Sequence, residues 1–141
     1  MAGKKSPITP QQKTALVQAA LKARGNAYAP YSKYKVGAAV LGASGKIYDG
    51  CNVENASFGL TCCAERISIF KAISSGEKSL IAICVAGKSP KPCGACRQVM
   101  AEFMSPTAPV YIAEAGKKAT VRAFTLDELL PFTFTSSEAG L

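Results

Sequence analysis

The chain is 141 residues long, a length that favours one domain, with a core expected over about 9–134. Hydrophobic residues make up 48% of it and charged residues 18%, which allows a sizeable core and argues against intrinsic disorder. The histidine count is 0, so histidine-based triads, HExxH proteases and imidazole acid–base catalysts are all excluded. Any catalysis must use other groups.

The formal net charge is +8, from 17 lysines and arginines against 9 acidic residues. The basic residues are scattered as singles and pairs, which favours a solvated surface over a nucleic-acid-binding one. No stretch approaches the roughly 20 apolar residues of a membrane span, and the N-terminal residues do not resemble a secretory signal. We therefore expect a cytoplasmic protein with no nucleic-acid or membrane partner, whose cysteines are thiols or metal ligands.

The first half of the chain predicts a helix, a hairpin and a second helix. Thr9 and Pro10 are typical of a helix start and predict a helix over 10–24. Two β-rich runs, 34–41 and 47–51, flank a turn at 42–45 and predict antiparallel strands. A second helix over about 62–75 is expected, with Thr61 as its cap.

The second half predicts a strand, a helix, two strands and a last short helix. Residues 80–86 are almost all apolar, which indicates a strand covered on both faces. Pro92, Cys93 and Gly94 lead into a helix that is expected to end near residue 104. Strands at 110–113 and 120–124 and a short helix at 126–130 follow. The order is α-β-β-α-β-α-β-β-α, an α/β fold layered as a sandwich of two or three layers around a mixed sheet.

The cysteines suggest a metal site. Cys93 and Cys96 form a CxxC at the start of a predicted helix, a spacing that also suits a redox pair, half of a zinc ribbon or chance. The remaining cysteines do not form a second CxxC, so a structural site of four cysteines is disfavoured. Cys51 and Cys84 lie in strand patterns and are expected to be small buried hydrophobes.

A third thiol at the start of the other helix completes a set of three ligands. Three protein ligands and one open position are typical of catalytic zinc, which lowers the pKa of a bound water from about 15.7 to roughly 7. Cys63 is preferred over Cys62 because Glu65, two residues after it, is then placed to move that water's proton. Three thiolates leave the zinc site with a net negative charge, for which Arg66 is the preferred compensating cation and Arg97 an alternative.

These residues belong to a wider set of motifs. The chain resembles the small homotetrameric zinc-dependent cytidine deaminases in segments that cover most of its length: YSKY at 31–34, VGAA at 36–39, CNVENA at 51–56, CAER at 63–66, PCGACRQ at 92–98 and ELLP at 128–131. The resemblance implies the fold of that family, a homotetramer, and hydrolysis of cytidine and 2′-deoxycytidine to the uridine nucleosides and ammonia in pyrimidine salvage.

The resemblance also implies a role for each matching residue. Cys63, Cys93 and Cys96 would bind one Zn²⁺ per chain, and Glu65 would carry protons to N3 of cytosine and to the departing amine. Other residues would contact the substrate: Asn52 and Glu54 at the ribose hydroxyls, Tyr34 and Ala64 at the base, and Phe134 lent to a neighbouring subunit's site. Phe132, two residues from Phe134, competes for that last role.

Two departures from the family and one alternation bear on the site. Tyr34 stands where the family commonly has phenylalanine, so its hydroxyl needs a partner. The segment 87–91 is shorter than usual, with Lys91 in place of serine. Strand-like alternation is expected to turn Val53 into the core while its neighbours Asn52 and Glu54 face the ligand.

Three other functions fit the sequence less well than cytidine deamination. A deaminase of an aminonucleoside antibiotic or of free cytosine would leave the pair Asn52 and Glu54 without a ribose to bind. A polynucleotide deaminase would need a basic track and stacking platforms, whereas the lysines are dispersed and tryptophan is absent. A structural zinc module would leave Glu65 without a role.

Overall fold

The computed structural model describes residues 8–116 and 120–141, and its elements follow the expected order. The helices and strands are α1 (Pro10–Ala23), β1 (Gly37–Gly42), β2 (Ile47–Cys51), α2 (Ala64–Ser74), β3 (Leu80–Gly87), α3 (Gly94–Phe103), β4 (Pro109–Glu114), β5 (Val121–Thr125) and α4 (Leu126–Leu129). Short 3₁₀ turns lie at Arg24–Asn26 and Phe58–Leu60. Within the described ranges, no helix combines the length and apolar character needed to cross a membrane.

The five strands form one mixed sheet in the order β2-β1-β3-β4-β5. β1 pairs antiparallel with both β2 and β3, β3 pairs parallel with β4, and β4 pairs antiparallel with β5. The turn predicted at 42–45 therefore does connect a hairpin. β3 lies in the centre, which explains why nearly all of its residues are apolar and buried.

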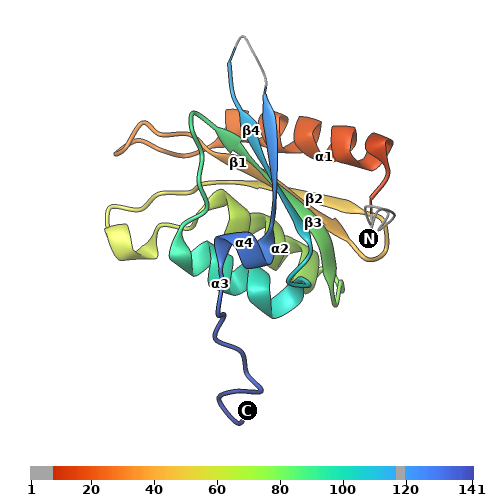
Figure 1. Cartoon of the computed structure of the whole chain (residues 1–141). Helices are drawn as coiled ribbons and strands as arrows, with labels where there is room; N and C mark the ends of the chain where they lie inside the picture. The colour runs from red at the N-terminus through yellow and green to blue at the C-terminus, as the bar shows by residue number, and fades with distance from the viewer. Residues whose placement is uncertain (1–7, 117–119) are drawn as a thin grey trace.

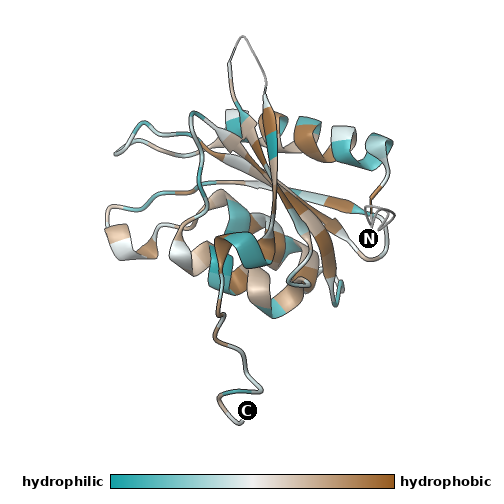
Figure 2. Cartoon of the chain, viewed as in Figure 1, coloured by the Kyte–Doolittle hydropathy of each residue, from teal (hydrophilic) through white to brown (hydrophobic). Residues whose placement is uncertain are grey.

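Helices cover both faces of the sheet and give three layers (Figure 1). α1 packs on one face, where Leu16 and Leu41 belong to the same core cluster. α2 and α3 pack on the other face, where Ile69 and Met100 share a core cluster with Val40. Neighbouring strand residues thus serve opposite cores, as the alternation of a strand requires. Figure 2 shows the resulting concentration of hydrophobic residues along the central strands.

Two element starts differ from the predictions. The first strand was expected from residue 34 but begins at Gly37, because the Asn52 side chain binds the carbonyl of Tyr34 at 2.8 Å and the N–H of Val36 at 2.9 Å. These backbone groups therefore bond to the Asn52 side chain and do not pair with a neighbouring strand. Gly37 itself lies so close to α1 that an added Cβ would sit 2.1 Å from the Ala20 carbonyl oxygen.

The second difference concerns the start of α2. The helix was expected from Cys62 with Thr61 as its cap, but it begins at Ala64 with Cys63 as the N-cap. Cys62 instead exchanges two backbone hydrogen bonds of 2.9 Å with Val53, nine positions earlier in the chain. The prediction that Val53 turns into the core was also wrong, since its side chain is 42% exposed.

Candidate metal centre and adjoining cavity

Three thiols meet at the N-termini of two helices. Cys63 is the N-cap of α2, Cys93 is the N-cap of α3, and Cys96 lies in the first turn of α3. Their sulfur atoms all lie within 4.8 Å of one another, with 3.9 Å between Cys63 and Cys93 and 3.4 Å between Cys93 and Cys96. Sulfurs placed tetrahedrally around zinc at about 2.3 Å are about 3.8 Å apart, so the three thiols fit one zinc ion.

The surroundings of these thiols favour negative sulfur. Free N–H groups and the helix dipole stabilise anions at a helix N-terminus. The pKa of the Cys63 thiol is lowered to about 5, first by a hydrogen bond with Cys96 and then by the Arg66 guanidinium, whose Nη2 lies 3.3 Å from Cys63 Sγ. The same bond with Cys63 raises the pKa of Cys96. Between Cys63 and Cys96, Cys63 is therefore the thiol with the lower pKa.

Glu65 lies beside this cluster in the first turn of α2 and is only 4% exposed. Burial raises the pKa of its carboxyl to about 7, with the negative charge at Cys63 as a further cause. A carboxyl with such a pKa can both accept and donate a proton near neutral pH, which general acid–base catalysis requires.

A cavity of about 150 Å³ joins the thiol cluster to the predicted substrate residues. Its lining contains Tyr34, Val36, Asn52, Thr61, Cys63, Ala64, Glu65, Val85, Pro90 and Lys91. A larger depression of about 310 Å³ shares Pro90 and Lys91 with this cavity and is lined also by residues of β4 and β5, but by none of the three thiols and not by Glu65. The smaller cavity holds both a cluster thiol and the buried carboxyl, so it is the candidate site.

Asn52 and Glu54 both hold the segment before β1. Asn52 is buried and lines the cavity while its amide binds the backbone of Tyr34 and Val36. The Glu54 carboxylate accepts the N–H groups of Tyr31 and Ser32 at 3.0 and 3.1 Å and also the Ser32 hydroxyl. These bonds, with the Ser32 hydroxyl first, lower the pKa of Glu54.

The other predicted site residues have different locations. Tyr34 and Ala64 line the cavity, and the Tyr34 hydroxyl finds its partner in the Lys88 carbonyl, 2.7 Å away. Phe134 lies on the C-terminal tail, where it borders a separate shallow depression with Phe132. Within one chain, Phe134 therefore does not line the cavity that contains Tyr34, Asn52, Ala64 and Glu65.

The two arginines that were considered as compensating cations are now distinguished. Arg66 contacts the Cys63 sulfur, as expected. Arg97 donates instead to the carbonyls of Pro92 and Leu129 at 2.8 and 2.6 Å and so ties the start of α3 to the end of α4.

Five further residues line the cavity that were not predicted as site residues: Val36, Thr61, Val85, Pro90 and Lys91. Val85 carries no chemical signal in the sequence, because it reads as one more apolar residue of β3. Pro90 had a usable signal, since it lies in the short segment directly before the CxxC.

Known proteins with similar sequences and structures agree with this geometry. The family model described as the cytidine and deoxycytidylate deaminase zinc-binding region matches residues 10–113. The chain belongs to this family. It is 44% identical over 126 residues to a cytidine deaminase of Halalkalibacterium halodurans, covering 87% of this chain and 94% of the relative. A cytidine deaminase of Mycobacterium tuberculosis is 48% identical over 118 residues, which cover 82% of this chain and 84% of the relative.

Solved structures of the family confirm the fold prediction. The crystal structure of a cytidine deaminase from Burkholderia pseudomallei is similar to this one, with a TM-score of 0.81 and 45% sequence identity. The match covers 90% of this chain and 100% of the Burkholderia chain. Zinc is the cofactor of the family region that matches, and the cluster of Cys63, Cys93 and Cys96 is able to hold one ion. The predicted α/β fold, family and cofactor are thereby confirmed.

Proposed function

We propose that this chain is a zinc-dependent cytidine deaminase, which converts cytidine and 2′-deoxycytidine to uridine and 2′-deoxyuridine with release of ammonia. One observation carries the chemistry: Cys63, of the three-thiol cluster, and the buried carboxyl of Glu65 line the same cavity. The names of the relatives support the substrate class. A purely structural zinc module would give Glu65 no reason to be buried beside the thiols with a pKa near neutrality.

In this proposal Cys63, Cys93 and Cys96 hold the zinc. When bound, zinc supplies a Lewis acid that makes water acidic enough to lose a proton at neutral pH. Glu65 accepts that proton and passes it to N3 of the cytosine ring while the water oxygen bonds to C4. Glu65 then takes the remaining proton from the oxygen now bonded to C4 and delivers it to the amino nitrogen, so that the C4–N bond breaks, a carbonyl forms at C4, and ammonia leaves.

Substrate recognition is assigned to the cavity walls. The Tyr34 ring, 42% exposed, and Ala64 pack against the base, and Asn52 binds the ribose hydroxyls from the cavity lining. Glu54, which is not part of that lining, binds the ribose from the adjoining segment. In the structure these two polar side chains also order the segment that carries Tyr34. Ribose binding and ring placement are therefore coupled through the same residues.

We extend the proposal to assembly and location. The chain is proposed to form a homotetramer in which Phe134 reaches a neighbouring site, supported by the exposure of this ring on the tail. All six cysteines are free, which suits the reducing cytoplasm. The reaction is proposed to serve salvage of pyrimidine nucleosides.

The test is loss of the cytidine ultraviolet chromophore with ammonia measured in parallel. We expect good turnover of cytidine and deoxycytidine and poor turnover of free cytosine, since unpaired ribose-binding groups disfavour it by up to about 10⁴-fold. Cytidine monophosphate should also be poor, because its phosphate brings negative charge towards Glu54. If free cytosine or a single-stranded oligonucleotide were deaminated with the same catalytic efficiency as cytidine, the proposal that the substrate is a nucleoside would be wrong.

A matched variant tests the role of Glu65. Glu65→Gln keeps the shape of the side chain and removes its ability to carry protons, so turnover should fall by at least about 10²-fold. Zinc content, measured by atomic absorption, should stay at one ion per chain because Glu65 is not a ligand. Loss of zinc in this variant would contradict the assignment.

A further inference from the structure

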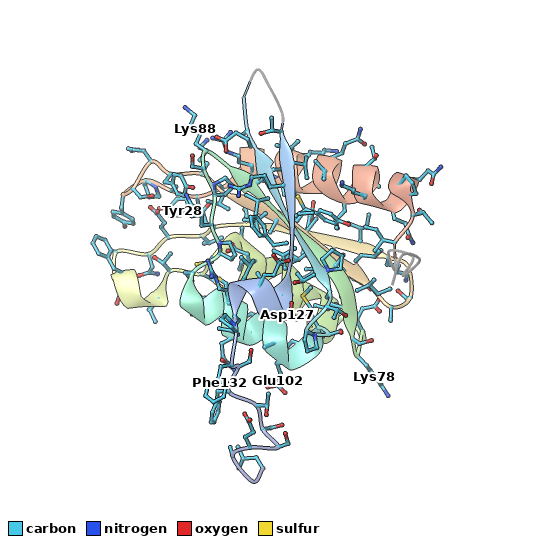
Figure 3. All side chains as sticks on the ribbon, in the orientation of Figure 1. Tyr28, Lys78, Lys88, Glu102, Asp127 and Phe132 are labelled. Atoms are coloured by element: carbon cyan, nitrogen blue, oxygen red, sulfur yellow. The ribbon has the colours of Figure 1, made fainter. Side chains whose placement is uncertain are left out.

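The short loop between β3 and α3 forms one wall of the candidate cavity. β3 ends at Gly87, and the loop reaches Pro92 after only the residues 88–91. Pro90 and Lys91 line the cavity, and Pro90 is buried. Figure 3 places Lys88 at the upper edge of the molecule, at the opposite end of the view from Phe132 on the tail. The loop's conformation therefore sets the width of the cavity.

The loop is held on one side by β4. Ser89 has a φ of +47°, a left-handed conformation that is unfavourable for a residue other than glycine. Its N–H donates to both carboxylate oxygens of Glu114 at 3.0 Å, and Ala115 donates to the Gly87 carbonyl at 2.7 Å. These bonds stabilise the strained turn and anchor its β4 side.

The other anchor comes from the opposite wall of the cavity. The Tyr34 hydroxyl donates to the Lys88 carbonyl at 2.7 Å, across 54 positions of sequence. Burial, followed by the negative charges of Glu114 and Glu65, raises the pKa of the Tyr34 phenol above 10.0, so the hydroxyl keeps its proton. Stacking on a base requires only the ring, which leaves the hydroxyl available for this bond.

We propose that Tyr34 is a positioning residue whose hydroxyl ties the aromatic wall of the cavity to the 88–91 loop and thereby fixes Pro90 and Lys91 opposite the ring. The proposal deepens the function proposed above and rests on it for the substrate assay. Without the bond, the loop retains its anchor to Glu114 but loses the one to the ring. The cavity is then wider and binds the substrate less well, while the proton chemistry at Glu65 is untouched.

The test compares Tyr34→Phe with Tyr48→Phe. Both changes remove one tyrosine hydroxyl that makes a hydrogen bond, since Tyr48 donates to Glu77 at 2.9 Å away from the cavity. Tyr34→Phe should raise KM for cytidine about 3- to 10-fold and leave kcat within about twofold, with zinc retained. Tyr48→Phe should change neither constant. A KM for Tyr34→Phe equal to that of the wild type overturns the proposal.

A second measurement does not depend on the substrate. Lys88 is exposed and followed by serine, so trypsin can cleave the loop there, whereas Lys91 is protected by the proline that follows it. Tyr34→Phe should be cleaved after Lys88 several times faster than the wild type or Tyr48→Phe, as shown by the fragment masses. Equal cleavage rates overturn the proposed anchor. If the wild type fails to deaminate cytidine, the proposed function fails, and the cleavage rates alone then decide on the anchor.

Discussion

Arg66 shows how the metal centre depends on a residue outside the ligand set. Its Nη2 lies 3.3 Å from Cys63 Sγ and 3.4 Å from the Thr61 carbonyl oxygen. Its Nε is buried and, within the part of the chain that the structure describes, has no hydrogen-bond partner. Burying an unpaired donor costs free energy, and the interaction with a negatively charged sulfur offsets that cost.

We therefore expect Arg66→Gln to weaken zinc binding. Without the guanidinium, three thiolates on Zn²⁺ lose the cation beside Cys63 that offsets their net negative charge. Zinc retention in the presence of a chelator, or kcat/KM, should fall about 10- to 100-fold. Lys71→Gln is the matched control, because it removes a positive charge from the same helix at an exposed pair with Asp49. Cys96→Ser serves as the reference for full zinc loss. If Arg66→Gln retained zinc and activity at the wild-type level, Arg66 would not be the cation that offsets the thiolate charge.

At this scale, sequence predicted best what depends on local spacing. Cys63 and Glu65 share one helical turn, and Cys93 and Cys96 share another, so their proximity follows from helix geometry. Two hydrogen bonds that shape the cavity could not be predicted from local sequence. Tyr34 finds the Lys88 carbonyl, and Asn52 finds the Tyr34 carbonyl, only after the sheet has brought distant segments together.

Glu77 joins two elements, the hairpin turn and the end of α2. Its buried carboxylate accepts the hydroxyl and the N–H of Ser44 and the Tyr48 hydroxyl. It packs so tightly that a Cβ at Gly42 would lie 2.3 Å from its carboxyl carbon. The Ser44 hydroxyl, followed by the Ser44 N–H and the Tyr48 hydroxyl, lowers the pKa of Glu77 below 4.5.

This shift predicts a pH-dependent contribution to stability. A carboxyl whose pKa is lower in the folded state stabilises the fold above its unfolded pKa, and the contribution is lost as the pH falls through the folded pKa. Glu77→Gln should therefore lower Tm most near neutral pH, and its difference from the wild type should shrink in acid. Circular dichroism melts across this range measure it. Ser44→Ala should reduce the same difference, and a difference that is constant with pH would contradict the prediction.

Element order was predictable, whereas two element starts were not. Apolar periodicity and proline or glycine boundaries are properties of local sequence, and they predicted in order the nine α-helices and strands found among the described residues. The starts of β1 and α2 are set by partners elsewhere in the chain. The Asn52 amide takes the backbone just before Gly37, and Val53 pairs with Cys62 in place of a first helical turn.

At the scale of the whole molecule, the exposed apolar side chains of the described residues include two pairs of aromatic rings. The C-terminal tail extends away from the three layers (Figure 1), and Phe132 and Phe134 on it are 105% and 64% exposed. In the second pair, the rings of Tyr31 and Phe58 pack together with their centroids 5.7 Å apart, and both are exposed. Such surfaces are typical of association between subunits, which a single sequence cannot place.

Active sites shared between subunits would give the tail a function that mixing can reveal. If Phe134 completes a neighbour's site, Phe134→Ala should raise KM, whereas Phe132→Ala, the control on the same tail, should not. Mixing Phe134→Ala with inactive Glu65→Ala should then restore wild-type KM in part of the sites. Random exchange between equal amounts of the two chains gives intact copies of both residues in about a quarter of them. Because neither variant alone contains a complete site, the wild-type kinetic phase can arise only across a subunit boundary. A monomer in light scattering, or a mixture without that phase, would show that Phe134 acts within its own chain or not at all.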